Sequence, residues 1–157
     1  MVNKINNWID QTLKSHSNQV TSCECFSSQF DGFYPTDIIS SSYFVVVDRL
    51  PKPDFPALRQ AGFGDFIDME TEAVTYKNTY FIKKGYESDI AIHFHELVHV
   101  LQWKKLGGLP FIQRYIEETL RFGYQNAQLE TMAYHLQNHF SMHKEPLSVP
   151  DYVLNNI

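Results

Sequence analysis

Cysteine, glycine, proline and long apolar runs are all scarce in this sequence of 157 residues. The two cysteines, Cys23 and Cys25, are separated by one residue and cannot cross-link distant parts of a fold, so we expect two free thiols. Glycine and proline supply only seven residues each, which excludes fibrous and proline-rich disordered proteins. The longest apolar run, 43–47, is far shorter than the roughly 20 residues that cross a bilayer, so we expect no membrane-spanning segment.

Positive charge is also in short supply. Thirteen Lys and Arg face eighteen Asp and Glu, the net charge is −5, and there is no basic run, which argues against nucleic acid as a partner. The first residues lack the apolar stretch of a secretory signal, so we expect a cytoplasmic protein. Apolar residues make up 43%, enough for a packed core, and the length fits a single domain spanning 1–157. The sequence gives no indication of the oligomeric state.

The first third of the chain combines a helix, a polar segment and a strand. Apolar residues at helical spacing predict a helix over 3–16. The polar segment 17–42 is interpreted as loops and short extended pieces. The β-branched and aromatic run 43–47 is too short for a buried helix and predicts a buried strand.

A proline-rich break separates this strand from a predicted hairpin. A short helical turn is expected around 57–60, stopping at Gly62 and Gly64. Alternating apolar residues over 73–83 then predict one or two strands that turn at Lys77-Asn78. The N-terminal half is therefore expected to contain a small β-sheet.

The C-terminal half is predicted to be helical. A first helix over 87–106 begins with a Ser88 cap and acidic residues and ends with two lysines before a Gly-Gly pair. A second opens at Pro110 and closes at Gly123, and a third runs from about Asn126 to His143. The tail, 146–157, is expected to be extended. The fold class is α+β, with the sheet packed on the first of three helices.

That first helix contains His95-Glu96-Leu97-Val98-His99, an H-E-x-x-H pattern. Residues four apart on a helix differ by about 40° in direction and about 6 Å in height, so both imidazoles can reach one cation. Glu96 lies beside them, where its carboxylate can take a proton from an activated water and pass it to a leaving group. Apolar residues surround the motif on nearly all sides, which predicts a buried helix whose polar groups need partners.

Catalytic zinc normally takes three protein ligands, so a third must come from downstream. The candidates are Glu117, Glu118, Glu130, His135, His139 and His143. Glu117 and Glu118 form an adjacent acidic pair, a pattern typical of a solvated helix edge. Glu130 is favoured because it stands among apolar neighbours in the first turn of the third helix.

The remaining histidines are expected to face away from the metal site. His135, His139 and His143 lie about 140°, 180° and 220° around the helix from Glu130, so their stripe cannot share its cation. His93 lies about 160° from His95 on the first helix, which indicates either a packing role or a supporting contact behind the site.

The motif helix, together with Tyr124-x-Asn126-x-x-Leu129-Glu130-x-x-Ala133-Tyr134 downstream, resembles the small gluzincin-type zinc metallopeptidases known as minigluzincins. The segment 73–83 looks like the strand region that these domains place before the active-site helix. In that family a Glu on a helix after the motif completes the zinc site, which implies one Zn²⁺ held by His95, His99 and Glu130. Members often carry a second acidic residue nearby, where this sequence has Met132.

The resemblance implies a zincin-like fold and hydrolysis of peptide bonds in a peptide or protein substrate. Glu96 would act as general base, and the family's edge strand, here 79–83, would hold the substrate backbone. Tyr115, Tyr124 and Tyr134 are all possible donors to the oxyanion. The alternatives to a peptidase are a catalytically weak or inactive zinc-binding module that acts in protein–protein interaction, and a metal-free structural domain. The same ligands could also hold other divalent ions.

Overall fold

The computed structural model describes residues 1–157 and confirms the α+β class. The helices are α1 (Val2–Ser15), α2 (Thr36–Ser40), α3 (Pro56–Leu58), α4 (Gly64–Asp68), α5 (Ile90–Leu106), α6 (Gly108–Phe122), α7 (Gln128–Ser141) and α8 (Val149–Asn156). The strands are β1 (Thr21–Ser22), β2 (Tyr43–Val47), β3 (Ala73–Tyr76) and β4 (Thr79–Lys83). Three short helical turns complete the structure, namely η1 (Cys23–Phe26), η2 (Arg59–Phe63) and η3 (Tyr124–Asn126).

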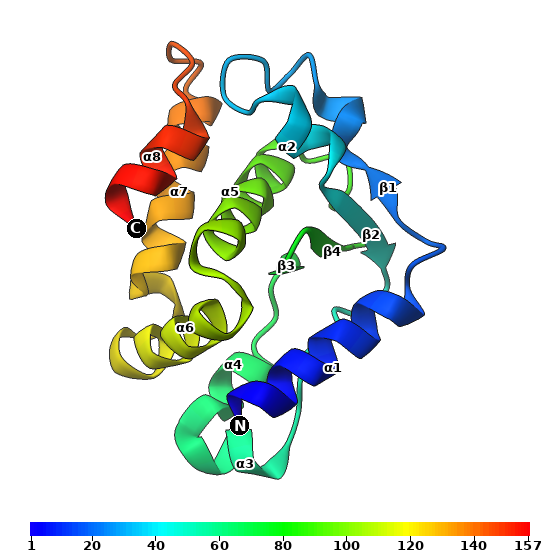
Figure 1. Ribbon diagram of the computed structural model, residues 1–157, viewed down its shortest axis with the longest axis vertical. Helices are drawn as coiled ribbons and strands as arrows, with labels where there is room; N and C mark the ends of the chain where they lie inside the picture. The colour runs from blue at the N-terminus through cyan, green and yellow to red at the C-terminus, as the bar shows by residue number, and fades with distance from the viewer.

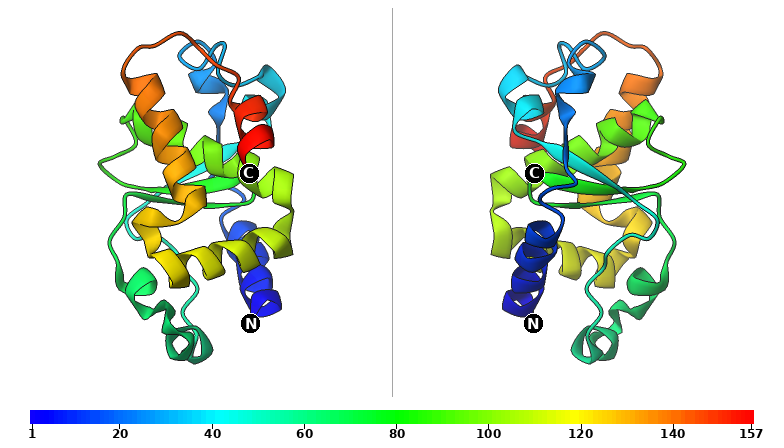
Figure 2. Two further views of the ribbon diagram at one scale, coloured as in Figure 1. Left: turned by 90° about the vertical axis from the view of Figure 1, so that its left-hand side faces the viewer. Right: turned by 90° about the vertical axis from the view of Figure 1, so that its right-hand side faces the viewer.

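The four strands form one mixed sheet in the order β1-β2-β4-β3. β2 and β4 run parallel, and the other two pairs are antiparallel. Helix α5 lies between the sheet and the pair α7 and α8, so it is covered on both sides (Figure 1). In the views of Figure 2 the sheet crosses the middle of the molecule. Helices α1 and α6 lie below it, and the loop-rich segment that precedes β2 lies above it. This layering explains why α5 is apolar nearly all round.

Two apolar clusters fill the interior. The first joins the segment before β2 to α5, α7 and α8, with Phe30 and Phe94 completely buried and their rings edge to face at 5.4 Å. The second joins α1 to β3, α5 and α6 and includes Ile9, Trp103 and Phe111. Since burying an aromatic side chain removes 150–250 Å² from water, the 23 aromatic residues supply much of the core.

Several predictions for the N-terminal half are confirmed. The helix over 3–16 is α1, the strand over 43–47 is β2, and 73–83 forms the hairpin β3–β4. Lys77 adopts a left-handed conformation with φ of 60° at the turn. The hairpin turn therefore lies where the sequence placed it.

Other parts of this half differ from expectation. The segment 17–42 holds η1 and α2 besides loops, and it contributes Phe30 and Phe33 to the core. The helical turn near 57–60 does not stop at Gly62 and Gly64. Gly62 takes a φ of 96°, which kinks the chain, and α4 begins directly at Gly64. Because glycine tolerates a positive φ, a kink can join two helical pieces where a helix end was predicted.

The first helix of the C-terminal half ends at Leu106 as predicted, but it begins at Ile90 and not at 87. Its cap is Asp89, whose side chain accepts from the Ala91 N–H, and not Ser88. Helix α7 begins at Gln128, because Asn126 ends η3 and does not act as a cap. The tail predicted as extended contains α8, whose Ser148 cap accepts from Asp151 N–H. This half therefore has four helices, and none of the helices is long and apolar enough to cross a membrane.

Candidate metal centre

Helix α5 carries the two histidines into the interior. His95 is 6% exposed, Glu96 4% and His99 5%. The helix is fixed against the edge of the sheet by two hydrogen bonds: Thr75 Oγ1 donates to the Glu96 carbonyl, and Trp103 Nε1 donates to the Thr75 carbonyl. Because each of these bonds satisfies a buried polar group, the helix is held in one position relative to β3.

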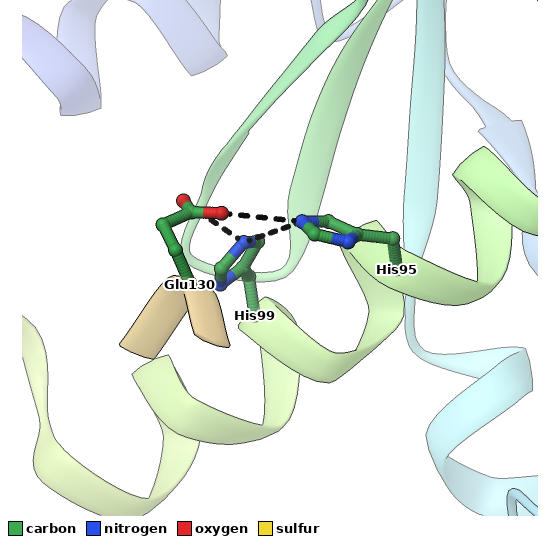
Figure 3. Close-up of side chains that lie close together, drawn as sticks. All are labelled: His95, His99 and Glu130. Carbon is green, nitrogen blue, oxygen red and sulfur yellow. Dashed lines mark hydrogen bonds and ion pairs between the residues drawn. The ribbon is translucent and has the colours of Figure 1, made fainter. Parts of the chain in front are cut away.

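Glu130 reaches the same point from the first turn of α7 and is 2% exposed. Its carboxylate lies 3.3 Å from His95 Nε2 and 3.2 Å from His99 Nε2, and the two Nε2 atoms are 3.2 Å apart (Figure 3). The structure thus brings together the three residues named as ligands, and together they could hold a metal ion.

The spacing of these ligand atoms fits a small divalent cation. With metal bonds of about 2.1 Å, two ligands of a tetrahedral site lie roughly 3.4 Å apart, close to the three observed separations. A His₂Glu set is one of the combinations that catalytic zinc uses with a fourth position open. The donor set and its geometry are therefore suited to a metal that retains one exchangeable site.

Hydrogen bonds on the outer side of each ligand set its direction. His99 Nδ1 contacts Gln102 Oε1 at 2.7 Å, and His95 Nδ1 contacts Gln137 Oε1 at 2.8 Å. An amide oxygen only accepts, so both Nδ1 atoms carry the proton and both Nε2 atoms can offer a lone pair to a cation. Tyr115 donates its hydroxyl to Glu130 Oε1 at 3.2 Å.

The buried charges influence one another strongly. Burial alone would raise the pKa of Glu130, but the imidazoles of His99 and His95 hold it well below its usual value. Burial would lower the pKa of His99, yet the Glu130 carboxylate raises it to about 9. Burial raises the pKa of Glu96, and the two imidazoles oppose this only in part. A cation entering the site would therefore displace a proton from His99.

No protein-family model, curated protein or solved structure matches this chain. The centre is therefore interpreted from its own geometry.

The sequence predicted that the acidic pair on α6 forms a solvated helix edge, and for Glu118 this is wrong. Glu117 is exposed, but Glu118 is 8% exposed, pairs with Arg114 at 2.8 Å, and accepts from the Leu129 N–H at 3.0 Å. Helix α7 has no capping side chain at its own N-cap, so Glu118 satisfies one of the free N–H groups at its start. The carboxylate thereby fixes the helix end that carries Glu130.

The other histidines lie outside the centre, as predicted. His93 is completely buried between Tyr80, whose hydroxyl contacts Nδ1 at 2.6 Å, and the Glu87 carbonyl, 2.8 Å from Nε2. His135 stacks on Tyr152, and His139 Nε2 contacts the Glu145 carbonyl. His93 is thus a packing residue. The two thiols are free, with Cys23 buried beside Tyr80 and Cys25 exposed.

Two cavities meet at Glu96. The first is a mostly apolar space of about 70 Å³, larger than the roughly 10–15 Å³ that one water needs, and it reaches His99, Glu130 and Tyr115. The second is more polar and more open and reaches His95 on the other side. Glu96 lines both cavities, so its side chain stands at the boundary between them.

The strand beside this cleft is β3 and not 79–83. The predicted edge strand, β4, is central in the sheet, with β2 on one side and β3 on the other. In the antiparallel β3–β4 pair, Thr75 and Ala73 occupy the positions whose backbone groups point away from β4. The Thr75 carbonyl accepts from Trp103, and the Ala73 carbonyl accepts from the Thr71 hydroxyl at 3.4 Å, so the open part of the edge is at Ala73, a residue that lines both cavities.

Gln102 and Gln137 were not predicted as part of the site. Gln102 follows His99 by one helical turn and is completely buried, an unusual position for a glutamine. In the sequence, Gln102 stands out as a polar residue between Leu101 and Trp103 in a helix that is apolar nearly all round, and this could have indicated its role. Gln137 lies on a mixed helix face and carries no such signal.

Proposed function

We propose that the protein is a zinc-dependent metallopeptidase whose general base is Glu96. The observation that carries the proposal is the buried triangle of His95, His99 and Glu130, with a second carboxylate, that of Glu96, 3.8 Å from His95 Nε2. A divalent metal bound there would supply Lewis-acid polarisation of a carbonyl and activation of a water. The ligand atoms of His95, His99 and Glu130 already lie 3.2–3.3 Å apart, so metal binding requires little movement of these side chains.

Glu96 is suited to proton transfer by its surroundings. Its carboxylate lies beside the ligand set, 3.8 Å from His95 Nε2, where a general base could accept a proton and return it. It is held on the rigid helix α5, and both cavities open onto it. We propose that Glu96 takes the proton of the attacking water and delivers it to the leaving amine.

The cleft is also suited to an extended peptide. The open edge at Ala73 would pair with the substrate backbone by strand addition, in place of the strand expected from the sequence. The apolar cavity would accept an apolar side chain next to the scissile bond. Tyr115 is committed to Glu130, so Tyr124 and Tyr134, which line the second cavity, are the remaining donors toward the substrate carbonyl.

The test combines metal analysis with one substitution. Protein purified without chelator is expected to contain about one zinc per chain, and Glu96→Gln is expected to keep the zinc while cleavage of a peptide library falls by about 10²–10⁴-fold. Glu117→Gln, an exposed carboxyl on α6, is the matched control and should cleave normally. Undiminished cleavage by Glu96→Gln would refute the mechanism.

Two other outcomes distinguish the alternatives. Stoichiometric zinc with no turnover of any library peptide would indicate a zinc-binding module of the same fold that acts in protein–protein interaction. Absence of zinc, and of any other divalent ion, would indicate a structural domain. Cytoplasmic location and a protein or peptide partner remain predictions that fractionation and substrate capture would check.

A further inference from the structure

Gln102 lies between the two helices that carry the metal ligands. It stands on α5 three residues after His99, on the same helix face, and its side chain is completely buried. Burying an amide is costly unless its hydrogen bonds are made, so the partners of Gln102 indicate what it does.

Those partners belong to both sides of the metal centre. The amide oxygen accepts from His99 Nδ1 at 2.7 Å. The amide nitrogen donates to the Leu129 carbonyl at 2.9 Å and contacts Met132 Sδ at 3.4 Å. Leu129 directly precedes the ligand Glu130 on α7. One side chain therefore connects a ligand histidine on α5 with the backbone next to the ligand carboxylate on α7.

The orientation of this amide is determined by its surroundings. A carbonyl and a thioether can only accept, so the NH₂ end must face Leu129 and Met132, and the oxygen must face His99. His99 consequently holds a proton on Nδ1, and Nε2, which faces His95 and Glu130, is the nitrogen left to bind a cation. The position of α7 thus selects the tautomer of a ligand on α5.

Gln137 makes a simpler contact. It reaches from α7 to His95 Nδ1, but it is only half-buried and lines the open cavity. Water from that cavity can replace its amide oxygen, whereas water has no comparable route to the buried Gln102. The two glutamines therefore provide a matched pair for comparison. Both accept from a ligand histidine, but only Gln102 also donates to the backbone of the opposite helix.

We propose that Gln102 is a positioning residue for the metal centre, which couples the tautomer and direction of His99 to the placement of Glu130 on α7. This inference rests on the metal centre of the proposed function and is independent of its hydrolytic chemistry. The Met132 sulfur, also on α7, accepts from the same amide nitrogen of Gln102.

The test measures metal binding by three variants, Gln102→Leu, Gln102→Glu and the control Gln137→Leu. Zn²⁺ affinity is measured by competition with a chromophoric chelator, and the visible spectrum of the Co²⁺-loaded protein reports the geometry of the ligands. Denaturant unfolding of the metal-free proteins gives the effect on stability separately.

Gln102→Leu is expected to weaken Zn²⁺ binding by about 10–100-fold and to change the Co²⁺ spectrum. Gln137→Leu should weaken binding by less than about tenfold with a spectrum like the wild type. Gln102→Glu keeps an acceptor for His99 and loses the donor to Leu129, so it should bind Zn²⁺ more tightly than Gln102→Leu although its metal-free stability is not restored.

Unchanged affinity and spectrum in Gln102→Leu would overturn the proposal, whatever its loss of stability. If Gln102→Leu fails to fold, Gln102→Glu decides alone, because it keeps the acceptor for His99 but loses the donor to Leu129. Zn²⁺ affinity below that of the wild type together with a changed Co²⁺ spectrum supports the coupling, and wild-type affinity and spectrum overturn it. A wild type that binds no Zn²⁺ or Co²⁺ overturns both this inference and the metal centre. Normal metal binding without hydrolysis contradicts only the peptidase.

Discussion

Zinc should raise the thermal stability of the protein, and Glu130→Gln should abolish most of that effect. The ligand atoms of the metal-free structure already lie within about 0.2 Å of tetrahedral spacing, so binding requires little rearrangement. A ligand that binds only the folded state at 100 times its Kd stabilises it by about 2.7 kcal/mol. For a chain of this length, 1 kcal/mol corresponds to about 2–4 °C, so the expected rise in Tm is about 5–11 °C.

The assay is thermal unfolding followed by circular dichroism, with zinc and then with excess chelator. Glu130→Gln keeps the shape of the side chain but removes its charge, so one of three buried ligands is lost and the rise in Tm should fall to a few degrees or less. Each variant is compared with its own metal-free form, because the substitution also removes the carboxylate that raises the pKa of His99. Glu117→Gln should show the full rise. An equal rise in Glu130→Gln would mean that zinc binds elsewhere, for example at His135 and His139.

Three further predictions concern groups away from the ligands. Glu118→Ala should lower the free energy of unfolding in urea by about 1–2 kcal/mol, because the Leu129 N–H at the start of α7 loses its acceptor. The control Glu117→Ala should stay within about 0.5 kcal/mol of the wild type. Equal effects of the two substitutions would contradict the capping role of Glu118. In thiol labelling of the native protein, exposed Cys25 should react and buried Cys23 should react only on unfolding. Burial raises the pKa of the Cys23 thiol from 9.0 to about 12, so above pH 9 the unfolded chain releases this proton more readily and stability should fall as pH rises toward 12. Cys23→Ala should flatten that dependence, and an unchanged slope would assign it to other groups.

The metal centre could be predicted from the sequence because local rules determine most of it. Helical spacing alone directs His95 and His99 to one side, and Glu130 was recognisable as a carboxylate among apolar residues at a helix start. Glu118 was wrongly predicted to be solvated, because its partner N–H at Leu129 lies on another helix. Sequence spacing contains no information on that contact.

The parts that were wrong depend on long-range contacts. The hairpin over 73–83 was predicted, but which strand lies at the edge depends on β2, which comes from residues 43–47. The final helix, α8, is short, and tertiary packing stabilises it: Val149 and Val153 are almost fully buried in the first apolar cluster. Gln102 belongs to the same class, since its role depends on the carbonyl of Leu129 across the helix interface.

Helix α1 contributes to the apolar cavity but supplies none of the three residues that could hold a metal ion. The metal ligands all come from residues 95–130, one continuous stretch of three helices, whereas Ile5 and Ile9 close the apolar cavity from the far end of the chain. Loop closure within the ligand stretch is entropically cheaper than the contact between α1 and α6, so we expect the ligand helices to assemble before the cavity wall. The part of the cavity wall that α1 contributes, Ile5 and Ile9, can therefore be changed by redesigning one amphipathic helix, while His95, His99, Glu130 and Glu96 remain as they are.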